Sequence, residues 1–108
     1  MIPVYQGVEI LETDRGSAKS MDGEPMDKWY VHGQIDSERK PILDFYNDLL
    51  LNSGMGQTQF ISVPALDGSG PNYAVSYADE NYLAEFYIEK LSKDVMTQYK
   101  LTVYRIRK

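Results

Sequence analysis

The single histidine, His32, is by residue type the best candidate for a general base. Nucleophilic catalysis needs such a base beside a nucleophile and oriented by an acid. No nucleophile turn lies near His32 in the sequence, and strand alternation places it next to Tyr30 on an outward sheet face. We interpret His32 as an exposed strand residue and assign no catalytic residue.

Acidic turns are the second place where chemistry could reside. With no cysteine and one histidine, only oxygen ligands for hard cations remain. Asp22-Gly23-Glu24 and Asp67-Gly68-Ser69-Gly70 lack the alternating ligands and final glutamate of a calcium loop, and Asp-Gly favours tight turns for backbone reasons. We predict plain turns and no metal.

The sequence also identifies no residues for nucleotide binding or for catalysis by paired carboxylates. Gly54-Met55-Gly56 and Gly68-Ser69-Gly70 do not continue into a phosphate-binding loop. Among 16 acidic residues, no pair is marked by an apolar pocket that would raise a pKa. We therefore predict a non-enzymatic protein without a cofactor, with a small carboxylate-based hydrolase as the least favoured alternative.

Length and charge restrict the remaining classes. With 108 residues, 43% hydrophobic and 13 of them aromatic, the chain is expected to form a single globular domain over 1–108. Its net charge of -5 argues against nucleic acid as a partner. The basic strip Lys100, Arg105, Arg107 and Lys108 is interpreted as a solvated strand end. No stretch is apolar enough for a membrane span and no leader pattern is present, so the protein either is cytoplasmic or begins after a removed leader.

The elements that must position any site begin with a helix at 37–53, where apolar residues recur at helical spacing. Asp36 or Ser37 could cap its start, Pro41 falls near the first turn, and Gly54 could close the end. Before it, residues 27–35 alternate, with Trp29, Val31, Gly33 and Ile35 on the core face. Val8 and Ile10 indicate a short first strand, followed by a mobile loop at 12–25.

Strand patterns dominate after the helix. Segments 58–63 and 73–77 are expected strands, separated by a loop at 64–71. Segment 82–91 fits a helix or a strand, and we favour the strand because a turn at Lys93 and Asp94 would set Phe86 opposite Leu101 and Ala84 opposite Val103. A turn at Asp79 and Glu80 would pair Tyr77 with Tyr82 and Val75 with Ala84 on the same face.

These patterns predict an α+β fold of order β-β-α-β-β-β, one helix packed on a twisted antiparallel sheet. Trp29 and Phe45 are expected to meet in its core. The alternative makes 80–92 a second helix in a ferredoxin-like arrangement.

The second sheet face collects a possible interaction surface, here called the outer-face patch: Tyr30, His32, Leu83, Tyr87 and Tyr104. Tyrosine suits recognition because its ring buries much area at low entropy cost. We expect a protein partner or self-association there, whereas the simpler interpretation is cross-strand packing.

Two stretches resemble a group of small exported bacterial domains, often lipoproteins. The opening Val4-Tyr5-Gln6-Gly7-Val8-Glu9 is similar to their Tyr-Pro-Gly-Ala-Glu-like strand, and Asp36-Ser37 through Phe45-Tyr46, Leu49-Leu50 and Gly54 to their helix. The resemblance implies a secreted or cell-envelope domain whose leader is absent from this chain, with no catalytic residue to carry over. The expected function is a non-catalytic binding or structural module, with a cytoplasmic protein–protein interaction domain as the alternative.

Overall fold

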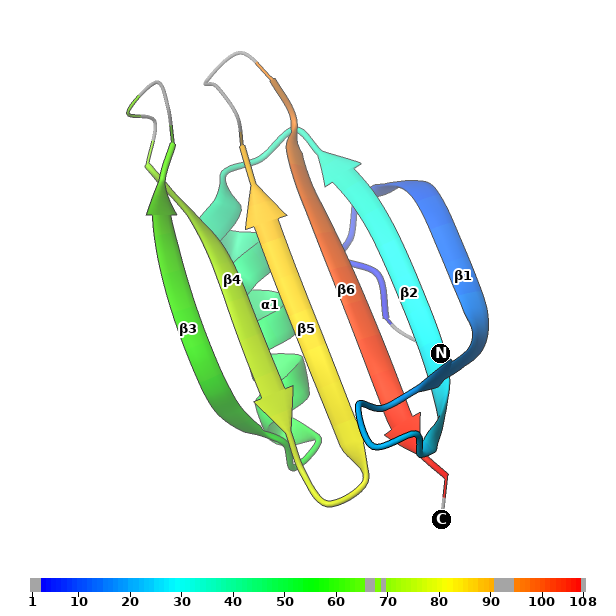
Figure 1. Cartoon of the computed structure of the whole chain (residues 1–108). Coiled ribbons are helices and arrows are strands. Elements are labelled where there is room, and N and C mark those ends of the chain that lie inside the picture. The colour runs from blue at the N-terminus through cyan, green and yellow to red at the C-terminus, as the bar shows by residue number, and fades with distance from the viewer. Residues whose placement is uncertain (1–2, 66–67, 69, 91–94, 108) are drawn as a thin grey trace.

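The computed structural model describes residues 3–65, 68, 70–90 and 95–107 and shows one helix against one antiparallel sheet of six strands (Figure 1). The elements are β1 (Glu9–Lys19), β2 (Pro25–Ile35), α1 (Arg39–Asn52), β3 (Gly56–Pro64), β4 (Pro71–Ala78), β5 (Tyr82–Glu89) and β6 (Thr97–Ile106). The α+β class is confirmed. The order has four strands after the helix, so the predicted β-β-α-β-β-β order, which counted three, is wrong.

The sheet order is β1-β2-β6-β5-β4-β3, with antiparallel pairing throughout. An N-terminal hairpin and a four-strand meander therefore join where β2 pairs with β6. The helix connects β2 to the far edge strand and lies behind β4 and β5 in Figure 1. Because the described residues form a single helix, on one side of the sheet, the core lies on that face and the other face is left uncovered.

The strand at 82–89 confirms the hairpin prediction. Phe86 pairs with Leu101 and Ala84 with Val103, so the ferredoxin-like alternative is wrong. The predicted turn at Lys93 and Asp94 lies outside the described residues.

In the β4–β5 hairpin the side chains lie on the predicted faces, but the register of the pairing differs from the prediction. Tyr77 pairs with Ala84 and Val75 with Phe86, two residues from the expected pairing. The turn is longer because Asp79 Oδ1 accepts hydrogen bonds from the backbone N–H groups of Asn81 and Tyr82, each 2.7 Å long. A shift of two residues leaves every side chain on its face.

The predicted loop at 12–25 is wrong for residues 12–19, which extend β1 along the whole of β2. Only the short connection around Met21 and Gly23 remains outside the strands. An edge strand needs no apolar face, and charged side chains there discourage further pairing. Apolar patterning therefore indicated only the start of β1, near Ile10, and not its continuation to Lys19.

The helix begins two residues later than predicted and its cap differs. Glu38 occupies the N-cap position and makes no side-chain capping bond, and the Ser37 hydroxyl donates to the Glu38 carbonyl. Pro41 lies in the first turn, and Gly54 has φ 103°, the left-handed conformation that ends a helix.

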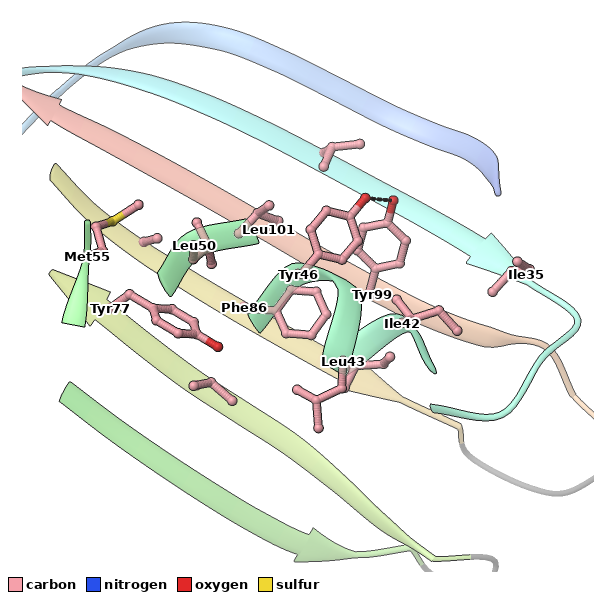
Figure 2. Packing of buried hydrophobic residues seen from close by; sticks show 14 residues of the cluster. Ile35, Ile42, Leu43, Tyr46, Leu50, Met55, Tyr77, Phe86, Tyr99 and Leu101 are labelled. Carbon is pink, nitrogen blue, oxygen red and sulfur yellow. Dashed lines mark hydrogen bonds between the residues drawn. The ribbon is translucent and has the colours of Figure 1, made fainter. Parts of the chain in front are cut away.

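The core is an aromatic cluster between α1 and the central strands (Figure 2). Tyr46, Phe86 and Tyr99 have ring centroids 4.9 to 5.9 Å apart. The Tyr46 hydroxyl donates to the Pro3 carbonyl, so Tyr99 is the donor in the 2.7 Å bond between the two phenols. At Gly33 a Cβ would lie 2.6 Å from Val8 Cγ1 and 3.0 Å from Tyr99 Cε1, which explains why glycine stands there.

Candidate functional site

The five residues of the outer-face patch lie on one sheet face, as predicted. His32 and Tyr87 both pair with Lys100 across β6, and Leu83 pairs with Tyr104. The inward pairs Val31–Leu101 and Phe86–Leu101 alternate with them, so the patch points away from α1.

Two polar groups of the patch have hydrogen-bond partners within the sheet. His32 Nε2 lies 3.1 Å from the Gln98 side-chain oxygen, and the Tyr87 hydroxyl donates to Glu89 over 3.0 Å. Burial and Glu89 raise the Tyr87 pKa. Leu83 and Tyr87 are each 38% exposed. The patch is a strand surface with modest apolar exposure.

The other sequence candidates fall into two groups. Around Asp22, Ser20 accepts backbone bonds from Gly23 and Glu24 and closes a turn, while Asp67 and Ser69 lie outside the described residues. Across residues 3–65, 68, 70–90 and 95–107, no three possible metal ligands cluster. The basic strip is not one surface: Lys100 lies on the outer face, and the Arg105 and Arg107 side chains pair with Asp27. Lys108 is not described.

A cavity of about 520 Å³ opens on the helix side of the sheet, beside the C-terminal half of α1. We call it the Trp29 groove. The helix contributes Leu49 and Leu50, and the sheet contributes inward residues of three strands. Figure 2 shows Leu50, Met55 and Leu101 close together at this end of the core. The residues that line this groove include Trp29, Leu49, Leu50, Tyr82, Val103 and Arg105.

Trp29 lies at the centre of this surface, between two cations. The guanidinium carbon of Arg105, on β6, is 5.5 Å from the Trp29 ring centroid, and that of Arg15, on β1, is 5.9 Å away. A second hollow, lined by Arg15, Ile10 and Val31, begins on the other side of Trp29. The indole therefore forms a partly exposed divider between two apolar hollows.

Asp27 holds the Arg105 guanidinium in place. Arg105 Nη2 lies 2.7 Å from Asp27 Oδ2, and Arg107 Nε lies 3.2 Å from Asp27 Oδ1. The hydrogen bond from Arg105 lowers the Asp27 pKa, with Arg107 and Arg15 acting in the same direction against burial. The Asp27 carboxylate is thus ionised at neutral pH and holds two arginine side chains at one end of the groove, while Asp79 also lines the groove.

The predicted contact between Trp29 and Phe45 is replaced by other contacts. Among the described residues, Phe45 makes its aromatic contacts with Tyr5 and Tyr46, at centroid distances of 5.3 and 5.0 Å. Tyr46 is the fully buried aromatic of the helix, and Trp29 lines the groove. The helix is rotated relative to the expectation.

Sequence reasoning missed the groove, although a usable signal existed. Six strands place the two edges about 24 Å apart at about 4.8 Å per strand, whereas one helix is about 10 Å across. A single helix cannot cover such a face, so some inward apolar residues must line an open surface. Trp29 was the candidate for such a residue, because it lies on the core face of the strand next to an edge of the sheet.

Comparisons with protein families, curated proteins and solved structures give no match for this chain. Within the part of the chain that the structure describes, no helix has the length and apolar character of a membrane span.

Proposed function

We propose that this domain is a non-catalytic binding module that holds an apolar group of its ligand in the Trp29 groove. The supporting observation is a cavity of about 520 Å³ with apolar walls from both helix and sheet and a guanidinium fixed beside an indole. Small-ligand sites are typically concave and apolar with few, well-placed polar groups, and span about 300–1,000 Å³.

The charges at the rim favour a ligand with an anionic end. Arg15 and Arg105 flank Trp29 and Arg107 lies nearby, with Asp27 as the shared counter-ion. Asp79, also at the groove, uses Oδ1 to close the turn before β5. An aromatic or aliphatic acid therefore suits this surface better than a cation does, although the chain as a whole is acidic.

The proposed location is the bacterial cell envelope, with the cytoplasm as the alternative. Support comes from the resemblance of the opening segment and the helix to exported lipoprotein-type domains. Fractionation of the host cells, followed by detection of the native protein, tests the location. Recovery of the protein only in the cytosolic fraction would reject the envelope.

The groove can be tested with an anionic aromatic dye, because Trp29 is the only tryptophan. We expect 1-anilinonaphthalene-8-sulfonate to bind the folded domain and to accept excitation energy from Trp29. Val103→Glu places a longer, anionic side chain on the groove wall and should weaken dye binding at least tenfold. Tyr104→Glu, at the next residue on the same strand, puts the same charge on the outer face and should leave binding within about twofold of wild type.

The matched pair also separates the two surfaces. Equal affinity in wild type and Val103→Glu would reject the groove, provided that both remain folded by circular dichroism. A loss confined to Tyr104→Glu would favour the second candidate, recognition through the outer-face patch. That candidate has support from the exposure of Leu83 and Tyr87 on the face that α1 leaves uncovered.

A further inference from the structure

The two edge strands of the sheet differ in how they discourage pairing with another chain. Natural sheets protect an edge with charged side chains, proline, bulges or short strands. In β1, five of eleven residues are charged, and a bulge interrupts the pairing between Ile10 and Glu12. In β3, sequence GQTQFISVP, no residue is charged, and the irregularity lies at Gln57–Gln59 while proline stands at the far end. Residues 59–63 thus form an unprotected edge.

The open edge of β3 offers specific backbone groups. The Ala65 N–H donates to the Gly70 carbonyl over 3.0 Å, which marks this pair as hydrogen-bonded across the hairpin. Bonding direction alternates along an antiparallel strand, so Val63 and Ile61 also point their backbone groups toward β4. Phe60 and Ser62 therefore direct their N–H and C=O groups to the open edge.

Side chains on this edge add apolar area to the free backbone groups. Every residue of β3 is exposed, and Phe60, Ile61 and Val63 are 49%, 41% and 48% exposed. Phe60 shares the helix-side face with Val75, whereas Ile61 lies on the outer face opposite Ala74. A strand added here would cover apolar side chains on both faces.

We infer that two copies of this chain associate through antiparallel pairing of their β3 strands, about a two-fold axis that passes through Ile61. In this register Phe60 exchanges both backbone hydrogen bonds with Ser62 of the second copy. By symmetry, Ser62 of the first copy makes the same two bonds with Phe60 of the second. Centring on Phe60 instead would set Ser62 against Thr58, where the β3–β4 pairing is irregular. The result is one continuous sheet with both helices on the same side.

Charge makes a second copy a suitable occupant. Each copy carries a net charge of -5, so most of its surface repels another copy. The nine residues of β3 carry no charge, so the self-pair juxtaposes no like charges at the contact. Added salt should strengthen the association by screening the remaining repulsion.

A single introduced cysteine tests the register, because the chain has none of its own. In the paired dimer the two Ile61 residues form a non-hydrogen-bonded pair, with Cα atoms about 4.5 Å apart, which suits a disulfide. Ile61→Cys should therefore become a covalent dimer under mild oxidation. Val63→Cys is the matched control: the two Val63 residues would lie about 13 Å apart along the strands and should not crosslink.

Sedimentation equilibrium tests the association without a crosslink. We expect the wild-type chain to dimerise reversibly, and Ser62→Pro to weaken dimerisation at least tenfold by removing one edge N–H without touching the β3–β4 bonds. Ser62→Lys is the second variant if proline disturbs folding. A wild-type chain that stays monomeric at about 1 mM would overturn the inference. So would dimers that survive both substitutions, or equal crosslinking of Ile61→Cys and Val63→Cys. Because β3 and β2 are separated by three strands, dye binding at Trp29 and dimerisation can fail independently.

Discussion

Three buried tyrosines bring polar hydroxyl groups into the hydrophobic core. Tyr46, Tyr77 and Tyr99 are at most 1% exposed, and each hydroxyl has a hydrogen-bond partner. A buried phenol is tolerated when it is neutral and bonded, whereas a buried phenolate carries a large desolvation cost. The stability of this core therefore depends on keeping these phenols protonated.

Tyr77 gives this dependence a defined pH range. Burial, reinforced by the charge of Asp48, raises the Tyr77 pKa from 10.0 to about 12. Between these values the unfolded chain releases a proton that the folded chain retains, so the free energy of unfolding falls as pH rises. One such group lowers it by at most about 1.4 kcal/mol per pH unit. Urea denaturation of wild type at pH 10 to 12 should show this fall.

Tyr77→Phe isolates the contribution of that hydroxyl. The variant should lose the 2.6 Å bond to Asn47 and be slightly less stable at neutral pH, yet show a shallower decline in the alkaline range. Some decline should remain, because burial also raises the pKa values of Tyr46 and Tyr99. Parallel curves for the two proteins would show that Tyr77 titrates at its ordinary pKa in the folded state.

At the scale of the element, the rotation of α1 about its axis determines which of its aromatic side chains is buried in the core. Tyr46 is fully buried between Phe86 and Tyr99, and Phe45 is only partly buried. We expect Tyr46→Ala to cost about 3–5 kcal/mol, the range for removal of a buried aromatic. Phe45→Ala should cost less than half as much. Guanidinium denaturation of both variants measures the difference, and a larger loss for Phe45→Ala would contradict the observed helix orientation.

The elements show what the sequence could and could not predict. The helix, the strand at 82–89 and its pairing with β6 followed from apolar periodicity, because these elements bury one face each. Strand β1 buries almost nothing, and its existence depends on backbone pairing with β2. Adjacent helical residues such as Phe45 and Tyr46 are both apolar, so periodicity alone did not fix the rotation of α1. Strand alternation correctly placed the five residues of the outer-face patch on one sheet face. The groove could be predicted only by comparing the width of six strands with the width of one helix.

At the scale of the whole molecule, β6 is the strand on which the sheet depends. It lies between β2 and β5 and joins the N-terminal hairpin to the meander. Amide hydrogen exchange should therefore be slowest in β5 and β6, where Ile88, Tyr99 and Leu101 are fully buried, and fastest in β1 and β3. Two-dimensional NMR after transfer to deuterated buffer resolves these groups. Protection in β1 equal to that in β6 would contradict this ranking.

The position of β6 also constrains how this domain forms as it leaves the ribosome. Met26 pairs with Ile106, and Ile35 pairs with Thr97. About seventy further residues must therefore be synthesised after β2 before it can pair with β6. At the usual 5–20 residues per second, that interval is on the order of several seconds. During it the β1–β2 hairpin, two of the six strands of the sheet, exposes the unpaired edge of β2, which is open to pairing with another chain.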